Sequence, residues 1–540
     1  MTFMMVRRDA AEAPVEHLYD IVRQRAERFP KAVALGAQDG PGWQTLDSQT
    51  LLAYIDGVAA ELERLGLRVG DRVVLWAPSG LRTPVYLFAL WKLGAIVVPF
   101  DRHMNPLAVE AILKSVEPRL VVLGYEQRPA WVPDEGAVEW WEPVPASASE
   151  HWQVPDEELA GILFTSGTTG QPKGCMISHA NLCSQVAAFT SRISLDEHSR
   201  LGSILPLSHL FELTCGLLYP LSRGSAIHYI PSRRGSMVVR VLAEQRVTHM
   251  MAVPQLLSLM GNALEQRLRS KLPPPVYRAL TGLAERMPMP IRRGMFFMVH
   301  RQIGGSLKLM AAGGAALQLE TQRLWELLGV DVIQGYGTSE CSPVIACGEP
   351  RRTPPGSVGR PLPGVQARLS PEGELQVKGP NVMRGYWRDP RRTAEVLTDD
   401  GWFSTGDLAR IDEHGNIWLQ GRARDLIVLP NGMNVWPQDV EDTLRAEPGV
   451  EDAAVLAVPT TSGGARLHAY LIPARPDDRR TDPQQLLPRA NARLASHQRV
   501  ATASWWPEAD FPRTNMLKVR RHLLPQPRTN RARPSAPPPT

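Results

Sequence analysis

The sequence predicts an α/β protein with a large N-terminal domain of layered βα subdomains, joined by a hinge to a smaller α+β C-terminal domain. Short β-rich runs alternate with helical patterns through most of the chain, which is typical of βα units around mainly parallel sheets. After about residue 370 the pattern changes to short strands and turns. The chain has 540 residues, of which 43% are hydrophobic, so roughly three to four compact units with large cores are expected.

The first predicted element is an amphipathic helix over 15–29, because Leu18, Ile21 and Val22 follow helical spacing and Pro30 ends the pattern. Residues 131–150 are expected to form a loop between subdomains. The alternating strand and helix patterns that follow the first helix occur at 71–78, 84–94, 119–125, 161–167, 178–189 and 201–207.

The C-terminal part is expected to begin near Gly421-Arg422. A hairpin around Gly415 precedes this point, and a strand, a turn at Asn431-Gly432 and a helix from near Pro437 follow it. Two more strands are expected within 451–475. The expected domains are therefore an N-terminal domain over 1–422, a mobile C-terminal domain over 423–524, and a Pro-rich, polar tail over 525–540 that we expect to be disordered.

Charge and composition exclude several classes of protein. The net charge is +5, but the residues from Phe511 onward carry seven basic side chains and no acidic one, which leaves −2 on residues 1–510 and argues against a general nucleic-acid surface. The longest apolar stretch, 85–100, is broken by Lys92 and Gly94 and is too short to span a membrane. The N-terminus lacks the apolar core of a signal peptide, and the five cysteines form no CxxC pair, so a reducing, cytoplasmic setting is expected.

The stretch from Leu163 to Gly174, LFTSGTTGQPKG, follows a predicted strand and precedes a predicted helix. Its glycines and hydroxyl residues, with a lysine near the end, let backbone N–H groups and hydroxyls surround a phosphate chain. It is not a Walker A loop, because Pro172 stands where that loop needs a glycine. The alternative is a Ser/Thr/Gly surface turn, which is hard to reconcile with a ten-residue string that ends in Pro-Lys-Gly.

This string resembles the phosphate-binding signature of the adenylate-forming superfamily and its AMP-binding acyl-CoA synthetases. Further motifs of that superfamily occur in the same order over about 360 residues, and together they are specific. They are Leu205-Pro-Leu-Ser-His209, Gly335-Tyr-Gly-Thr-Ser-Glu340, Ser404-Thr-Gly-Asp407, Gly421-Arg-Ala-Arg-Asp425 and Pro512-Arg-Thr-Asn-Met-Leu-Lys518.

Physical reasons accompany several of these assignments. ATP brings about four negative charges, so Mg²⁺ and a carboxylate are needed to hold it, and Glu340 is the matching acid with Thr168 as a second ligand. Tyr336 offers an aromatic face for adenine, although a tyrosine is more often ordinary core. Asp407 has two acceptor oxygens for the ribose hydroxyls, and Arg422 supports the same ribose or phosphate.

Lys518 is the main catalytic candidate, because adenylation joins two anions and an ammonium between them lowers their repulsion. The resembling enzymes usually carry glycine before this lysine, whereas here Leu517 stands in its place. The resemblance also implies that Arg424 marks the domain hinge and that the turn at Gly432 reaches the thioester-forming site. It places His209 in the wall of the acyl or adenylate pocket, not as a base.

The predicted site therefore contains three residues nearest the chemistry, a nucleotide-binding set and a metal-binding pair. The residues nearest the chemistry are Lys518, Glu340 and His209, and the metal-binding pair is Thr168 and Glu340. The nucleotide- and cofactor-binding set is Thr165, Ser166, Gly167, Thr168, Thr169, Lys173, Gly314, Ala315, Gly335, Tyr336, Gly337, Thr338, Asp407, Arg422, Arg424 and Gly432.

The resemblance implies a two-step ligase that uses ATP, Mg²⁺ and coenzyme A to convert a medium- to long-chain fatty acid into acyl-AMP and then acyl-CoA. The stretches 286–305 and 428–441 resemble bacterial long-chain fatty acyl-CoA synthetases more than aryl- or acetate-activating enzymes. The four methionines within 286–305 suit an acyl tunnel, although plain core is the commoner role. Two alternatives stay open: a fatty acyl-AMP ligase that loads an acyl carrier protein, and a catalytically degenerate nucleotide- or acyl-binding module. Peripheral membrane contact also stays open, and nucleic acid is not an expected partner.

Overall fold

The computed structural model divides into two compact units. The first unit comprises residues 1–368, 376–405 and 411–418, and the second comprises 369–375, 406–410 and 419–540. The domain boundaries expected from the sequence stay a prediction. Residues whose structure is described are 15–39, 42–102, 104–132, 136–146, 153–154, 158–165, 172–422, 427–429, 433–459, 465–513 and 519–525.

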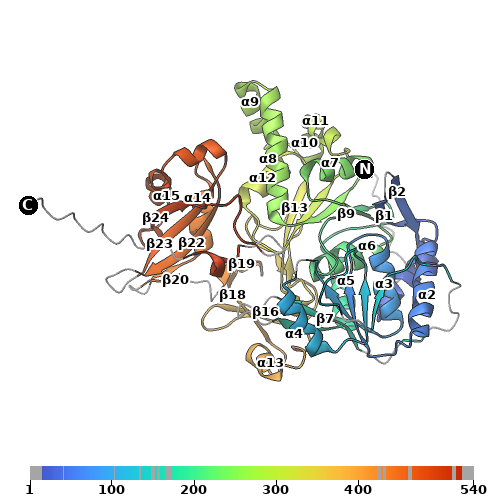
Figure 1. The fold of residues 1–540 in the computed structure, drawn as a ribbon. Helices are drawn as coiled ribbons and strands as arrows, with labels where there is room; N and C mark the ends of the chain where they lie inside the picture. The colour runs from blue at the N-terminus through green and yellow to red at the C-terminus, as the bar shows by residue number, and fades with distance from the viewer. Residues whose placement is uncertain are drawn as a thin grey trace, which may run out of the picture. The chain divides into compact units, whose positions relative to one another are not determined.

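A six-stranded sheet lies in the first unit, with strand order β6-β5-β3-β4-β7-β8 (Figure 1). All neighbouring strands run parallel except β7 and β8, which form an antiparallel pair. The strands are β3 (Arg72–Trp76), β4 (Ile96–Phe100), β5 (Leu120–Leu123), β6 (Ala137–Glu139), β7 (Leu159–Thr165) and β8 (Lys173–Ser178). The strand β6 corrects the expectation of a loop throughout 131–150; its three residues are too few to give a periodic pattern.

A nine-stranded sheet in the same unit has the order β15-β14-β13-β12-β11-β9-β10-β1-β2. The strands from β13 to β1 run parallel to their neighbours, and β2, β14 and β15 are antiparallel additions. The strands are β1 (Val33–Asp39), β2 (Gly42–Asp47), β9 (Arg200–Ser203), β10 (Ala226–Tyr229), β11 (His249–Ala252), β12 (Leu309–Ala312), β13 (Asp331–Tyr336), β14 (Ala346–Cys347) and β15 (Arg360–Pro361).

Helices of the first unit pack on these sheets. The apolar stretch 85–100 forms most of helix α3 and strand β4, and its side chains are buried because α3 lies inside the unit. The Trp91 indole donates to the Ala160 carbonyl at 2.9 Å, and Lys92 pairs with the buried Asp56 at 2.7 Å. The helices are α1 (Leu18–Arg28), α2 (Ser48–Arg64), α3 (Arg82–Lys92), α4 (Pro106–Val116), α5 (His179–Phe189), α6 (Tyr219–Ser222), α7 (Gly235–Glu244), α12 (Leu319–Leu327) and α13 (Pro390–Val396).

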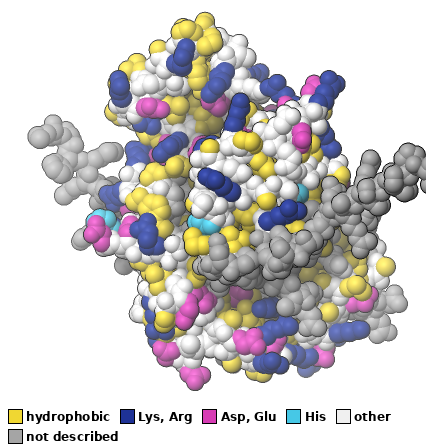
Figure 2. All heavy atoms as spheres, turned by 90° about the vertical axis from the view of Figure 1, so that its left-hand side faces the viewer, with side chains coloured by type: hydrophobic (Ala, Val, Ile, Leu, Met, Phe, Trp, Pro, Cys, Tyr) yellow, Lys and Arg dark blue, Asp and Glu magenta, His cyan; other side chains and the backbone are white. Residues whose placement is uncertain are grey.

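Four further helices are α8 (Pro254–Lys271), α9 (Pro274–Ala284), α10 (Met289–Met295) and α11 (Phe297–Gln302), and the last two carry the Met-rich stretch. In Figure 1 α9 lies at the end of the first unit farthest from the sheet of β3–β8, and Figure 2 shows apolar, Lys and Arg side chains together at that end. Helix α10 has no buried residue, and Met298 is 57% exposed. The other three methionines of this stretch are half-buried, so none of the four belongs to a fully buried core, and the acyl-tunnel role stays a prediction.

A four-stranded sheet, in the order β16-β17-β18-β19, contributes residues to both units. Its strands are β16 (Gln366–Leu369), β17 (Glu374–Lys378), β18 (Phe403–Ile411) and β19 (Ile417–Arg422). The neighbours β18 and β19 are joined by a turn at which the Asp412 N–H donates to the Asn416 carbonyl at 3.0 Å. Gly415 takes a φ of +78° in this turn, which favours glycine, so the hairpin expected around it is confirmed.

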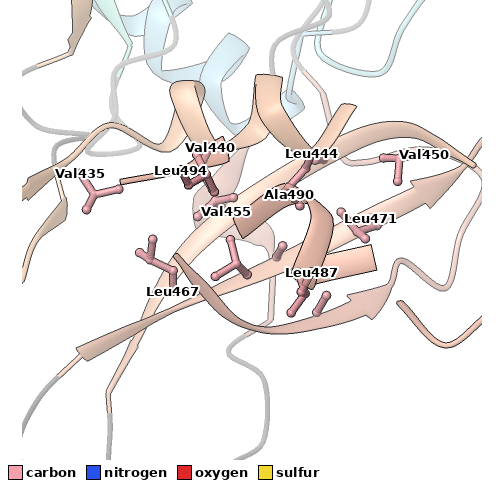
Figure 3. Close-up of a cluster of buried hydrophobic side chains, with 14 residues drawn as sticks. Val435, Val440, Leu444, Val450, Val455, Leu467, Leu471, Leu487, Ala490 and Leu494 are labelled. Atoms are coloured by element: carbon pink, nitrogen blue, oxygen red, sulfur yellow. The ribbon is translucent and has the colours of Figure 1, made fainter. Parts of the chain in front are cut away.

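The second unit has its own apolar core between helices and a three-stranded sheet, in the order β22-β23-β24. Figure 3 shows Val440 and Leu444 of α14 directed toward Val455 and Leu471 of the sheet. This unit also contains the antiparallel pair β20-β21. The elements are β20 (Ile427–Val428), β21 (Asn434–Val435), α14 (Pro437–Arg445), β22 (Val450–Pro459), β23 (Ala465–Pro473), α15 (Leu487–Arg493) and β24 (Val500–Trp505).

Basic side chains near the C-terminus are tied to acids of the same unit. Arg521 donates to both carboxylate oxygens of the buried Glu441, at 2.8 and 2.7 Å, and Arg513 pairs with Asp452 and Asp510 at 2.6 Å. Part of the basic C-terminal charge is thus neutralised within the unit. Within the described residues, no helix combines the length and apolarity that a bilayer crossing requires.

Candidate functional site

Most of the described candidate residues of the first unit follow neighbouring parallel strands of the nine-stranded sheet. Strands β9, β11, β12 and β13 are consecutive neighbours, so their carboxyl ends share one edge. The chain continues from β9 to β10 on one side and returns to β11 on the other, which makes β9 a topological switch point. Ligands of open α/β sheets bind at the carboxyl ends beside such a point.

The motif that follows β13 carries Glu340. Tyr336 ends the strand and is 9% exposed, and a short 3₁₀ helix, Ser339–Cys341, holds Glu340. The Met383 N–H donates to the Glu340 carbonyl at 2.8 Å, which fixes the backbone at this position. A Cβ added at Gly337 would lie 1.9 Å from the Pro343 carbonyl oxygen, so only glycine fits where the two segments cross.

Glu340 and Lys173 both contact Tyr386. The Tyr386 hydroxyl donates to Glu340 Oε1 at 2.9 Å, and the Lys173 ammonium lies 5.1 Å from the centre of the Tyr386 ring. Burial and the adjacent Glu340 carboxylate raise the pKa of the Tyr386 hydroxyl, so it remains protonated and donates. The structure thus brings two predicted site residues together through a tyrosine that the sequence motifs did not single out.

Strand pairing positions the two ends of the phosphate-loop candidate. Thr165, the last residue of β7, pairs in register with Lys173, the first residue of β8. Tyr386 forms an isolated antiparallel bridge with Cys175, two residues beyond Lys173, which explains how the tyrosine reaches both partners. Residues 166–171 between the two strands lie outside the described part of the chain.

His209 lies in a turn after β9, half-buried, with Nε2 3.5 Å from Oδ2 of Asp101. Two residues on, the Phe211 ring lies against Gly313, where a Cβ would be 2.8 Å from the ring. This contact links the His209 segment to Gly314 and Ala315, which follow β12. Small residues at this point thus let the two segments approach.

A π-helix over Glu212–Leu218 begins directly after Phe211. Such segments frequently occur at functional sites. Glu212 is fully buried and accepts a hydrogen bond from the Ser203 hydroxyl at the end of β9. Burial raises the pKa of the Glu212 carboxyl to about 8, against the opposing effect of that hydrogen bond. The carboxyl group of Glu212, three residues after His209, is therefore neutral near pH 7.

The second unit brings Asp407 and Arg422 together. Asp407, in β18, is buried, and Oδ1 lies 3.0 Å from Nε of Arg422 at the end of β19. The preceding Gly406 has a φ of +74°, and its N–H donates to Glu374 Oε1 at 2.7 Å. These contacts orient the Asp407 carboxylate.

Several predicted site residues fall outside the described part of the chain, and the structure says nothing of their geometry. These residues are Ser166, Gly167, Thr168, Thr169, Arg424, Gly432 and Lys518. Conversely, sequence reasoning missed Tyr386, Phe211 and Asp101. The only signal for Tyr386 was its place in an aromatic, Gly-containing stretch. From a single sequence, such a residue cannot be distinguished from an ordinary core tyrosine.

Comparisons with known proteins identify the family of the chain. Residues 22–387 match the family described as AMP-binding enzyme. The long-chain-fatty-acid–CoA ligase of Salmonella typhimurium is 28% identical over 556 residues, covering 88% of this chain and 91% of that protein. ATP-bound MatB from Rhodopseudomonas palustris is 26% identical, with a TM-score of 0.75 and coverage of 94% of this chain and 97% of that one.

A more distant neighbour supports the fold alone. The o-succinylbenzoate CoA synthetase of Bacillus subtilis, solved with its acyl-adenylate intermediate, is 22% identical with a TM-score of 0.77, covering 95% of this chain and 99% of that one. The family match spans about two thirds of the chain and includes Thr165, Lys173, His209, Tyr336, Glu340 and Tyr386. The chain therefore belongs to the AMP-binding enzyme family, within the adenylate-forming superfamily, and its enzyme class is that of the AMP-forming acid–thiol ligases.

Proposed function

We propose that this enzyme activates a medium- to long-chain fatty acid in two steps. A carboxylate oxygen of the acid attacks the α-phosphorus of ATP, and pyrophosphate leaves to give acyl-AMP. The sulfur of coenzyme A then attacks the acyl carbonyl carbon, and AMP leaves with the phosphate oxygen. The proposal of a fatty-acid substrate rests on the similarity to a long-chain-fatty-acid–CoA ligase over 88% of this chain.

Glu340, with Thr168, would hold the Mg²⁺ that accompanies ATP. The described residues contain no cluster of three or more His, Cys, Asp or Glu side chains that suits a metal. A single carboxylate nevertheless fits, because Mg²⁺ is usually held by one or two carboxylates together with substrate phosphates and waters. The hydrogen bond from Tyr386 orients this carboxylate. The ion supplies charge compensation for the phosphates when bound.

The remaining predicted residues are assigned to the three parts of ATP: the phosphates, the adenine and the ribose. Thr165 and Lys173, with the loop 166–169, would contact the phosphates. Tyr336 and the small residues after β12 and β13 would contact the adenine, and Asp407 with Arg422 would bind the ribose. The small-residue set is Gly314, Ala315, Gly335, Gly337 and Thr338.

Lys518 would place its ammonium between the carboxylate and the α-phosphate, where it lowers the repulsion between two anions. Arg424 would be the hinge between adenylation and thioester formation, and Gly432 would approach the thioester-forming site. The predicted division into an AMP-binding domain over 1–422 and a mobile domain over 423–524 belongs to this proposal.

The test is pyrophosphate release from ATP with a series of acids from acetate to long-chain fatty acids, with and without coenzyme A. We expect turnover to rise with chain length and acyl-CoA to accumulate by mass spectrometry. Release that is unaffected by coenzyme A, with no acyl-CoA formed, contradicts the thioester step and directs the acyl-AMP to a carrier protein instead. Turnover confined to acetate or aromatic acids contradicts the fatty-acid substrate.

A second comparison separates catalysis from mere binding. Lys518→Ala should reduce pyrophosphate release by at least a hundredfold, whereas Lys114→Ala, a change at another lysine, should leave it unchanged. Leu517→Gly, assayed beside them, measures the effect of the leucine before Lys518. A wild-type protein that binds ATP but forms no adenylate would favour a degenerate binding module.

A further inference from the structure

Helices α8 to α11 expose an unusual concentration of large apolar side chains. Of the fifteen large hydrophobic residues that are exposed in the described part of the chain, six lie between residues 259 and 298. The two most exposed of these, Phe297 and Met298, are 61% and 57% exposed and adjacent in sequence. The other four are Leu259, Val276, Leu283 and Ile291.

Helix α9 shows why these side chains are exposed. Val276 and Leu283 are seven residues apart and so lie on the same face of the helix, while Ala284 is its only buried residue. Tyr277 attaches this helix to α8 by polar contacts: its hydroxyl donates to Glu265 of α8 at 2.7 Å, and the Arg269 guanidinium lies 4.8 Å from its ring centre. Val276 and Leu283 remain 49% and 51% exposed.

Charge in the same segment is strongly positive. Residues 254–305 contain eight Lys and Arg residues and two Glu residues, a net charge of +6, although the whole chain carries only +5. All the remaining residues together therefore carry −1. This charge is concentrated on 52 residues, next to the exposed apolar side chains.

The basic residues of this segment fall into three groups. Arg267 donates to Gln302, and Arg269 pairs with Glu265. Arg292 and Arg293 donate to backbone carbonyls and hold the helices together. By contrast, no ion pair is recorded in the described structure for four exposed basic side chains. These are Lys271, Arg278, Arg286 and Arg301.

We propose that the exposed face of α8–α11 docks on an anionic lipid surface. Apolar side chains flanked by Lys and Arg are the combination that enters a bilayer interface, since the apolar groups leave water while the cations meet lipid phosphates. The two cavities described in this structure are lined by residues outside α8–α11. The occupant that matches both the charge and the apolar side chains is a bilayer that contains acidic lipids.

The test measures binding of the full chain to vesicles of phosphatidylcholine with phosphatidylglycerol, and to vesicles of phosphatidylcholine alone. Two variants probe the face: Phe297→Ser with Met298→Ser, and Arg278→Gln with Arg286→Gln and Arg301→Gln. Two matched controls lie elsewhere: Leu107→Ser, at an apolar residue that is 75% exposed, and Arg391→Gln, at a side chain that is 92% exposed. Thermal unfolding checks that each variant is folded.

We expect cosedimentation with the anionic vesicles, a loss of at least tenfold in the partition coefficient for both variants, and no change for the controls. Binding by the wild type should also weaken with added salt, and Phe297→Trp should be quenched by brominated lipid. Equal binding to both vesicle types, or variants that bind like the wild type, would overturn the proposal. So would a dimer in sedimentation velocity that the apolar variant dissociates while vesicles bind nothing.

Vesicle binding is measured without ATP, fatty acid or coenzyme A. Its outcome is therefore separate from that of the proposed ligase reaction. A chain that forms acyl-CoA but ignores anionic vesicles retains the proposed function and loses only the docking surface.

Discussion

The Tyr386 hydroxyl donates to Glu340 Oε1 at 2.9 Å, across 46 residues of sequence. This hydrogen bond holds the carboxylate, while the Met383 N–H donates to the backbone carbonyl of the same residue. Burial and the carboxylate itself keep the phenol protonated. The tyrosine is therefore a positioning residue for the proposed magnesium ligand.

Tyr386→Phe should lower kcat/KM for ATP in the pyrophosphate assay by roughly ten- to a hundredfold, because a hydrogen bond to a charged group is lost. Raising the Mg²⁺ concentration should restore part of the rate if the carboxylate is merely misoriented. Tyr277→Phe is the matched control. The Tyr277 hydroxyl, in helix α9, also donates to a glutamate, Glu265 of α8, at 2.7 Å. Equal effects of the two changes would contradict the positioning role.

Gly337→Ala should destabilise the first unit and reduce adenylation, because the new Cβ would lie 1.9 Å from the Pro343 carbonyl oxygen. Overpacking of this kind costs about 1–3 kcal/mol or more. Gly335→Ala, two residues earlier, is the control for stability alone, because its Cβ would be no closer than 3.8 Å to any neighbour. We expect a lower Tm for Gly337→Ala alone; an unchanged Tm would show that the Pro343 segment moves aside.

The sequence predicted the elements whose patterns are long or have clear ends. Helix α1 was expected over 15–29 and spans Leu18–Arg28, and the helix expected near Pro437 begins at that proline. The three-residue strand β6 was missed, because its pairing depends on the edge of β5 and not on its own pattern. The order of strands in a sheet depends on tertiary packing. A pattern of apolar residues therefore could not predict the switch point at β9.

The candidate site was predicted as a set of motifs but not as a network. Glu340 and Lys173 were named separately, and the residue that joins them, Tyr386, carries no local signature. The exposure of the Met-rich stretch was not predicted, because helical periodicity shows that an apolar face exists but does not say whether the protein covers it. Phe296 of that stretch is buried, whereas Phe297 is exposed.

Asp407→Asn should raise KM for ATP about tenfold with a smaller effect on kcat, because one acceptor for the proposed ribose contact is replaced by an amide. The change also weakens the 3.0 Å pairing with Arg422. Asp412→Asn is the control in the neighbouring β18–β19 turn, where the carboxylate accepts from Asn416. If both variants lost stability but neither changed KM, Asp407 would be a structural residue.

Glu212 makes the stability of the first unit depend on pH. Its pKa is about 8 in the folded chain against the ordinary 4.5, because the carboxyl is fully buried. Between these two values the unfolded chain has released the proton that the folded chain retains, so the free energy of unfolding falls as pH rises through this window. The full loss is on the order of 5 kcal/mol, reached near pH 8 and above.

Glu212→Gln removes this titration while keeping the shape and an oxygen that accepts from Ser203. The Tm of the variant minus that of the wild type should therefore increase between pH 5 and pH 8, because only the wild type loses stability in that interval. Glu110→Gln, at an exposed position of α4 in the same unit, should show no such increase. Parallel Tm profiles for wild type and Glu212→Gln would mean that the buried carboxyl is ionised throughout, and that Ser203 and the surrounding backbone compensate for its burial.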